Sequence, residues 1–255
     1  MQSNDKMATT KKFTSELIPE IRSRGEDGQE TRSPDAAVAV SSCPASPHPR
    51  ISASPLKEII IATGNKHKVE EISAILKDLN IKAVPMISFP SYPKTVEDGK
   101  TLEENAAKKA GEAALFFKKW ALADDTGLEV DYLNGEPGVY SARYAGELCT
   151  YEDNNNKLLD NLKNVPDEKR TAKFRCVIAI SSPEGAVSLA DGQIFGIISK
   201  TAAGVNGFGY DPVFFVPEYN KTFAELSSEI KNKISHRSKA LQKAKEVIKQ
   251  LIVNS

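Results

Sequence analysis

The sequence predicts one α/β domain built on a mixed β-sheet with helices on its flanks. In the first half of the chain, apolar stretches with the length of strands alternate with helical patterns, whereas strand-like segments follow one another in the middle. Helices between strands favour parallel pairing, and consecutive strands favour antiparallel pairing. With 255 residues, 40% of them hydrophobic, the chain can bury a substantial core.

The first 55 residues are expected to form a disordered extension outside this domain. The segment contains one aromatic residue, Phe13, and it ends in a tract rich in serine and proline at residues 41–49. Such a composition buries too little apolar surface to offset the entropy of ordering the chain. We therefore place the folded domain at residues 56–255.

The domain is expected to open with a strand, a turn and a helix. After Glu58, residues 59–62 form a short apolar run that is typical of a buried strand, and the helix begins at about His67. The apolar residues of this helix share one face through their spacing: Val69, Ile72, Ile75, Leu76 and Leu79. A second helix is expected over residues 101–118, because Thr101 followed by Glu104 is a capping-box pattern.

The rest of the domain is expected to contain mostly strands between two further helices. Two short strands, 121–123 and 128–130, are expected on either side of a turn at residues 124–127. A helix, three β-rich segments and a last helix then follow at about 151–163, 171–181, 186–199, 212–216 and 235–252. The sequence contains no internal repeat.

Charge and cysteine content exclude several classes of function. The 34 basic and 34 acidic side chains cancel, so the chain lacks the basic excess with which proteins bind nucleic-acid polymers. Cys43, Cys149 and Cys176 lack the spacing of a disulfide framework or a zinc site, which favours a reducing compartment. No apolar stretch approaches the ~20 residues of a membrane helix, and no secretory signal is evident. We therefore expect a cytoplasmic protein with no membrane and no nucleic-acid polymer as a partner.

The turn between the first strand and the first helix is a candidate phosphate site. Backbone N–H groups and the positive end of a helix dipole bind anions there, glycine allows a close approach, and lysines add charge. The candidate residues are Thr63, Gly64, Asn65, Lys66, His67 and Lys68. Neither a Walker A loop nor a G-x-G-x-x-G sequence follows the strand. The alternative is an ordinary turn with solvent-facing lysines.

Acidic residues form the candidate metal and catalytic site. Asp124 and Asp125 are adjacent, and Mg²⁺ commonly takes one or two carboxylates and leaves its other positions to water and phosphates. One of the two could also orient an attacking water. Glu97 and Asp98 could supply further ligands. The alternatives are a plain turn for the first pair and a solvated acidic loop for the second.

Two segments near the end of the chain could recognise a nucleobase. Phe208 stands between two glycines, so its ring face can stack on a base, and Asp211 can accept a hydrogen bond from a ring N–H. Lys231, His236 and Arg237 offer several donors, which suit the carbonyl oxygens of hypoxanthine or xanthine better than the amino group of adenine. A glycine-rich turn with a core phenylalanine and a serine-capped helix start are the alternatives.

Six short motifs are each ambiguous alone, but together and in this order they are specific for one protein family. They are Thr-Gly-Asn-x-x-Lys, Glu-Asn-Ala, Ala-Asp-Asp-Thr-Gly-Leu, Tyr-Ser-Ala-Arg-Tyr, Phe-Gly-Tyr-Asp-Pro and Ser-His-Arg. The set resembles the inosine-triphosphate pyrophosphatase family, also called XTP/dITP diphosphatases, over about residues 58–252. The first 55 residues lie outside this resemblance.

The resemblance implies an elongated α/β fold with a long mixed sheet, two lobes around a substrate cleft, and a homodimer. It implies an enzyme that uses Mg²⁺ to hydrolyse deaminated purine nucleoside triphosphates (ITP, dITP and XTP) to the monophosphate and pyrophosphate, which cleanses the nucleotide pool. By matching motifs, Glu97 and Asp125 would hold Mg²⁺, and Asp125 would also be the catalytic base.

The same matching implies a substrate-binding set. Residues 63–68 and Lys109 would contact the phosphates, with Arg143 as a further contributor to the site. The other residues carried over, for the base and its surroundings, are Thr126, Phe208, Gly209, Tyr210, Asp211, Lys231, His236 and Arg237. Thr126 stands where many relatives have serine but keeps the hydroxyl. His67 stands where many bacterial relatives have glycine, and it is expected to point outward from the first turn of its helix.

Three other functions compete with this interpretation. A Maf-like pyrophosphatase is disfavoured because its Ser-x-Ser-Pro-Arg-Arg opening is absent, and an oxidoreductase because its glycine fingerprint is absent. A nucleotide-binding module without turnover is disfavoured by the retained acidic and lysine residues. The division of work between Asp124 and Asp125 stays open, because a metal-bound carboxylate is a weaker base.

Overall fold

Three consecutive isoleucines, Ile59, Ile60 and Ile61, create the first strand, and all three are fully buried. β-Branched side chains favour extended backbone, and burial on both faces favours a central position in a sheet. In the computed structural model, which describes residues 56–253, this strand is β1 (Glu58–Ile61), with a parallel neighbour on each side. The extension expected at residues 1–55 lies outside the described residues, as does Cys43.

Within the described residues, seven strands form one sheet in the order β2-β1-β3-β4-β5-β6-β7. β1 pairs in parallel with β2 and β3, and all later pairs are antiparallel. The other strands are β2 (Lys82–Pro85), β3 (Trp120–Val130), β4 (Thr171–Ser181), β5 (Val187–Ile198), β6 (Phe214–Val216) and β7 (Lys221–Thr222). The mixed sheet predicted from the sequence is confirmed.

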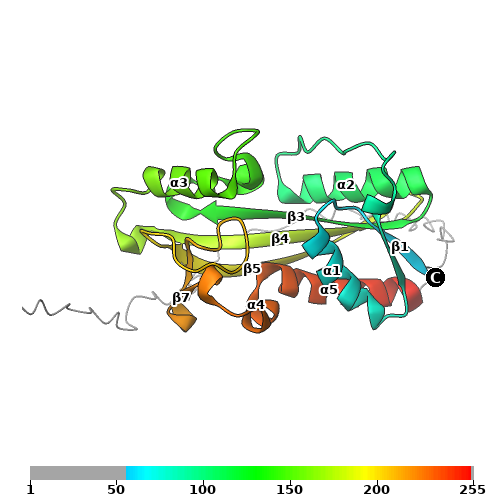
Figure 1. The fold of residues 1–255 in the computed structure, drawn as a ribbon. Helices are drawn as coiled ribbons and strands as arrows, with labels where there is room; N and C mark the ends of the chain where they lie inside the picture. Colours follow the sequence, from blue (N-terminus) through cyan, green and yellow to red (C-terminus); the bar gives the residue numbers. More distant parts are fainter. Residues whose placement is uncertain (1–55, 254–255) are drawn as a thin grey trace, which may run out of the picture. The chain divides into compact units, whose positions relative to one another are not determined.

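Helices cover both faces of this sheet (Figure 1). On one face lie α2 (Leu102–Phe117) and α3 (Tyr151–Asn161). On the other face lie α1 (Lys66–Lys77), α4 (Ser228–Ile234) and α5 (His236–Val253). No helix among residues 56–253 has both the length and the apolar character that a membrane crossing requires.

The two faces are packed by side chains of different size. Ala106, Ala110 and Ala113 of α2 are fully buried against the sheet, so this helix can approach β3 and β4 closely. On the opposite face, Ile72 of α1 and Leu241 of α5 belong to one cluster with the alternate residues of β1, β3 and β4. The sheet is therefore held from both sides at its parallel end.

The start of α2 is capped as the sequence predicts. Thr101 Oγ1 accepts a hydrogen bond from the Glu104 amide at 3.1 Å. The Glu104 carboxylate returns to the Lys100 amide at 2.6 Å, one residue before the cap. Two N–H groups that the helix itself cannot satisfy are thereby satisfied, so the sequence signal and the observed start agree.

The turn predicted at residues 124–127 is wrong, because β3 runs through this segment without interruption. β4 pairs with it residue by residue, with Asp124 opposite Ile178 and Asp125 opposite Val177. Asp, Thr and Gly are common in turns, but a long antiparallel partner keeps these residues extended. Three short elements, β2, β7 and α4, were not predicted by any pattern in the sequence.

The order of the first three strands leaves part of one β3 edge unpaired. β1 pairs with β3 as far as Leu122, whose carbonyl accepts from the Ala62 amide at 2.7 Å. The next partner on this edge is Pro137, which forms an isolated bridge with Glu129. In the described structure, residues 124–127 therefore have no strand partner on that side. The helix after β1 and the helix before β3 lie on opposite faces, an arrangement that marks ligand sites in α/β proteins.

Candidate active site

Asp124 and Asp125 point to opposite faces of β3 at this unpaired edge. Side chains alternate along a strand, and the preceding residues of β3 alternate between the cluster against α1 and α5 and the cluster against α2. Asp124 Oδ2 lies 2.8 Å from Lys68 Nζ of α1, and Asp125 Oδ1 lies 2.8 Å from Lys109 Nζ of α2. A ligand across this edge can thus be contacted from both faces of the sheet.

Asp124 is the buried centre of a network of charges. Its side chain is 1% exposed and faces Lys68 at 2.8 Å and Arg237 Nε at 3.6 Å. Burial works against the charged form, but the two cations outweigh it and hold the pKa of Asp124 well below its ordinary value. Arg237 also contacts Glu71 of α1 at 3.2 Å. Asp124 is therefore a permanent anion that ties α1 and α5 to β3.

Asp125 shares the ammonium of Lys109 with Glu97. Lys109 Nζ lies 2.8 Å from Asp125 Oδ1 and 3.1 Å from Glu97 Oε2. Burial raises the pKa of Asp125, and the negative charge of Glu97 adds to this effect against the pull of Lys109. At Glu97, burial again opposes the charged form, but Lys109 outweighs it and the pKa is lowered. Asp125 is thus the carboxylate of the pair that accepts a proton more readily.

The loop that carries Glu97 is fixed at two backbone positions. The Gly99 amide donates to Asn105 Oδ1 of α2 at 2.8 Å, and a Cβ at Gly99 would come within 2.6 Å of the same oxygen. Arg143 Nη2 donates to the Glu97 carbonyl at 3.2 Å. Asn105 was not predicted as a site residue, because its hydrogen bond depends on the folded position of the loop.

The carboxylates fit a divalent cation that takes few protein groups and completes its shell with water and the phosphate oxygens of a bound nucleotide. Among the described residues, no group of three or more acidic, histidine or cysteine side chains could enclose a metal ion. Glu97 and Asp125 nevertheless converge on one cationic group, the ammonium of Lys109. Mg²⁺ commonly uses one or two carboxylates and completes its shell with water and phosphate oxygens. Asp98 instead pairs with Lys108 at 2.6 Å, so nothing indicates that it is a ligand.

The turn before α1 offers fewer free amides than the sequence suggested. Asn65 caps the helix, and its Oδ1 accepts from the amides of His67 at 3.0 Å and Lys68 at 3.4 Å. The amides of Gly64 and Lys66 have no acceptor within the described part of the chain. A Cβ at Gly64 would meet nothing within 4 Å, so the protein itself does not require glycine there, whereas a closely bound ligand could.

The side chains of this turn divide between the site and the solvent. Lys68 reaches Asp124, whereas the side chain of His67 is 77% exposed and points outward, as its first-turn position predicts. Thr63 Oγ1 accepts from the Asn65 amide at 3.2 Å, which shapes the turn. Thr126 Oγ1 lies 3.4 Å from Asp124 Oδ2, on the same face of β3.

A second group of predicted residues gathers at the start of α5. Gly207 has φ of +90°, and a Cβ there would come within 2.0 Å of Asp211 Oδ2 and 2.3 Å of Lys231 Nζ. Asp211 and Lys231 form an ion pair at 2.5 Å. The Phe208 ring is 37% exposed, with the guanidinium of Arg237 over it at 5.7 Å from the centroid. Because Arg237 also faces Asp124, this group is connected to the acidic edge.

Three residues carried over by resemblance have clear packing roles. His236 is buried, and its ring stacks on Phe174 with centroids 4.8 Å apart. Burial and the neighbouring positive charges hold the pKa of His236 well below its ordinary value, so it is neutral. Tyr210 is buried and its hydroxyl donates to the Ser141 carbonyl at 2.9 Å. The carbonyl of Gly209 accepts from Asn155 of α3 at 3.0 Å.

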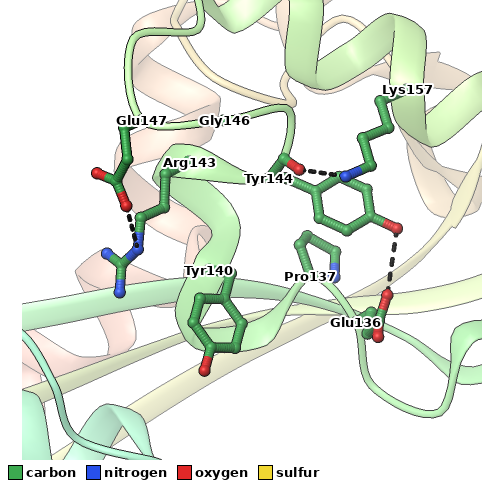
Figure 2. A pocket seen from close by; sticks show the side chains of 8 residues that line it. All are labelled: Glu136, Pro137, Tyr140, Arg143, Tyr144, Gly146, Glu147 and Lys157. Atoms are coloured by element: carbon green, nitrogen blue, oxygen red, sulfur yellow. Dashed lines mark hydrogen bonds and ion pairs between the residues drawn. The ribbon is translucent and has the colours of Figure 1, made fainter.

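A cavity of about 370 Å³ lies beside Arg143 (Figure 2). It is lined by Glu136, Pro137, Tyr140, Arg143, Tyr144, Gly146, Glu147 and Lys157. Figure 2 shows the pair Arg143–Glu147 on one side and Lys157, which donates to the Tyr144 carbonyl, on the other. Arg143 was expected to contribute to the site, and Tyr140 and Tyr144 belong to the same sequence motif. The bond from Arg143 to the Glu97 carbonyl places the cavity next to the Glu97 loop.

Sequence and structure comparisons identify relatives over the whole described domain. A sequence model of the Ham1 family matches residues 59–247. A protein of Desulforamulus reducens named dITP/XTP pyrophosphatase is 51% identical over 197 residues, which cover 77% of this chain and 98% of that protein. The structure of a HAM1 protein from Coxiella burnetii superposes with a TM-score of 0.72 at 42% identity, covering 76% of this chain and 98% of that one. The motif resemblance is thereby confirmed, and the chain belongs to the Ham1 family.

Proposed function

We propose that the protein hydrolyses deaminated purine nucleoside triphosphates, with ITP, dITP and XTP as substrates, to the monophosphate and pyrophosphate. The observation that carries this proposal is the convergence of Lys68, Lys109 and the carboxylates of β3 on one unpaired strand edge. Cations from both faces of the sheet suit a polyanionic ligand, and the acidic pair suits its metal ion and an attacking water. Relatives named dITP/XTP pyrophosphatase in Desulforamulus reducens and Clostridium perfringens, 51% and 49% identical, support the same activity.

The phosphate chain would lie between the turn before α1 and the side chain of Lys109. The unpaired amides of Gly64 and Lys66 would donate to phosphate oxygens, and the helix dipole of α1 would favour their charge. Lys68 and Lys109 are already held by carboxylates, so they are pre-positioned and need little reorganisation when charge develops.

Mg²⁺ is the proposed cofactor, and Glu97 and Asp125 are the residues that would hold it. When bound, it would neutralise charge on the phosphate oxygens. The two carboxylates already converge on one cationic group, the ammonium of Lys109, so they stand close enough together to share a metal ion. Asp124 faces the other side of the strand and is engaged by Lys68, which supports a structural role for it in the substrate site.

Asp125 is the proposed base of the reaction. Its carboxylate lies at the unpaired strand edge, where it would accept a proton from a water molecule. The water oxygen would form a bond to the α-phosphorus, and the bond from this phosphorus to the bridging oxygen would break. Pyrophosphate would leave with the electron pair, and the products would be a nucleoside monophosphate and pyrophosphate.

Base recognition is assigned to the residues around Phe208. The ring would stack on the purine, while Lys231 and Arg237 would donate to its carbonyl oxygens. Asp211 accepts a hydrogen bond from the Phe208 amide at 3.4 Å and forms an ion pair with Lys231, so it fixes the loop. Its carboxylate would also accept a hydrogen bond from a ring N–H of the base. His236, neutral and packed on Phe174, supports the start of α5.

The test is a product analysis with the full-length protein and Mg²⁺. ITP, dITP, XTP, ATP and GTP are incubated separately, and nucleotides and phosphates are separated by ion-exchange chromatography. We expect monophosphate and pyrophosphate from the deaminated nucleotides and little reaction with ATP or GTP. Inorganic phosphate with a diphosphate would contradict attack at the α-phosphorus. Intact ITP that nevertheless binds would favour the second candidate, a nucleotide-binding module.

We also propose that the protein acts in the cytoplasm as a homodimer on free nucleotides. The proposal of a reducing compartment is supported by the spacing of its cysteines, of which Cys149 and Cys176 are free. The homodimer is supported by the family resemblance. Analytical ultracentrifugation of the full-length protein tests it, and a sedimentation coefficient of a monomer at all concentrations would contradict it.

A further inference from the structure

The ring of Tyr151 pairs with the ring of Phe208, although no sequence motif singled Tyr151 out. The two ring centroids are 6.2 Å apart, and the ring planes are tilted by 39°. Tyr151 is 53% exposed and Phe208 is 37% exposed. Two aromatic rings that face each other while both remain open to solvent leave apolar area that a planar ligand could cover.

The position of Tyr151 is set by well-defined contacts of α3. It is the first residue of this helix, directly after Thr150, which forms a complete capping box with Asp153. One turn later, Asn155 donates to the Gly209 carbonyl at 3.0 Å, so the same side of α3 is fixed to the loop that carries Phe208. The backbone that carries Tyr151 is therefore fixed by its helix cap and is also hydrogen-bonded to the loop that carries Phe208.

We propose that Tyr151 and Phe208 form an aromatic slot that holds the purine base of the substrate between two rings. The inference rests on the proposed function and deepens it by adding a second wall to the base site. A base stacked between parallel rings needs two intervals of ~3.4 Å, or ~6.8 Å in all. The observed 6.2 Å is slightly less, so the rings separate a little and lose their tilt when the base enters.

The slot contributes affinity rather than discrimination. Stacking tolerates any base because every base has a π-face, whereas selectivity depends on groups that face the base edge, such as Lys231. Tyr151 should therefore stabilise the ground state and the transition state equally, which affects KM and leaves kcat unchanged. Since the hydroxyl is not needed for stacking, phenylalanine should replace it fully.

The experiment measures kcat and KM for ITP with the full-length wild type and the variants Tyr151→Ala and Tyr151→Phe. Inorganic tripolyphosphate, which has phosphates but no base, serves as a competitive inhibitor of each. For Tyr151→Ala we expect KM to rise about 5- to 150-fold with kcat within about twofold of wild type. The inhibition constant of tripolyphosphate should stay the same, and Tyr151→Phe should behave as the wild type. Tyr132→Ala, which removes another tyrosine that is 52% exposed, is the matched control.

The outcomes separate this inference from the proposed function. If the wild type hydrolyses ITP and Tyr151→Ala keeps its KM, the slot is overturned while the function stands. A parallel loss of ITP and tripolyphosphate binding would also overturn it, because a general distortion of the site would then be the cause. If the wild type does not hydrolyse ITP, calorimetric titration with ITP still decides the slot: weaker binding by Tyr151→Ala alone supports it, and equal binding overturns it.

Discussion

Adjacent carboxylates on one strand have different surroundings and therefore different roles. Asp124 is 1% exposed at its side chain and faces Lys68 and Arg237, whereas Asp125 shares Lys109 with Glu97. Alternation along β3 separates the two carboxylates although they are neighbours in sequence. The sequence indicated that both aspartates belong to the site. It could not assign them different roles, because the residue types at 124–127 predicted a turn and not a strand whose side chains alternate between faces.

Replacement of each aspartate by asparagine should separate chemistry from stability. Asp125→Asn should lower kcat for ITP by about 100-fold or more, because the base is lost while Lys109 keeps Glu97 as a partner. Asp124→Asn should lower the free energy of unfolding by about 3–5 kcal/mol, because it leaves Lys68 and Arg237 facing a neutral group at a buried position. Steady-state kinetics and urea unfolding measure the two effects. Full turnover in Asp125→Asn would remove this residue from the mechanism.

The neutral, buried His236 should make the fold sensitive to mild acid. Its pKa is held well below the ordinary value by burial and by the charges of Arg237 and Lys68. Above pH ~6.5 the side chain is neutral in both states and contributes nothing. Below that, the unfolded chain takes up a proton that the folded chain does not, so the free energy of unfolding falls by up to ~1.4 kcal/mol per pH unit.

Thermal unfolding between pH 5 and pH 8 checks this effect of His236. The Tm of the wild type should decrease towards pH 5, and the decrease should be smaller in His236→Gln even if that variant is less stable at every pH. His67→Gln removes a histidine that is 77% exposed and is the matched control. Identical pH slopes for the wild type and His236→Gln would show that this histidine does not set the acid sensitivity.

Among the elements, the starts of the four predicted helices and the ends of β4 and β5 agree with the structure to within one residue, whereas the length of β3 does not. The cap of α2 was predicted from Thr101 and Glu104, since both residues are local to the helix. The length of β3 was not predictable, because it depends on β4, a partner about fifty residues away in the chain. β2 was missed for a related reason: its four residues are partly exposed and gain their extended form by pairing with β1.

Asn105, in the first turn of α2, should influence the affinity for Mg²⁺, because it anchors the loop that carries Glu97. Asn105→Ala removes the acceptor of the Gly99 amide, so the loop loses an anchor and Glu97 is less well placed. We expect the Mg²⁺ concentration for half-maximal turnover to rise several-fold. Thr101→Ala removes the cap of the same helix and should cost about 1 kcal/mol of stability without changing the Mg²⁺ requirement. Equal Mg²⁺ requirements in the two variants would contradict an anchoring role for Asn105.

At the scale of the whole molecule, the candidate site draws on residues from Thr63 to Arg237. Motif order predicted which segments take part, and the mixed sheet was predicted from the alternation of strands and helices. The contacts between them were beyond prediction: Arg237 of α5 reaches Asp124 of β3 and Glu71 of α1 through the packing of three elements. Glu71 stands three residues after Lys68 on α1, so helical spacing was the one signal that could have indicated it.

The domain boundary proposed at residue 56 leads to a prediction for the whole chain. The buried clusters of the described structure begin at Leu56, and the Ham1 family match covers residues 59–247. The relative from Clostridium perfringens matches over 100% of its own length but over 77% of this chain. A chain that starts at Leu56 should therefore keep the kcat/KM of the full-length protein for ITP within about twofold, and its Tm within about 2–4 °C.

Kinetics and calorimetry on the shortened and the full-length chain provide the comparison. A large loss of kcat/KM with an unchanged Tm would assign residues 1–55 a part in the reaction, and a large loss of Tm would move the domain boundary towards the N-terminus.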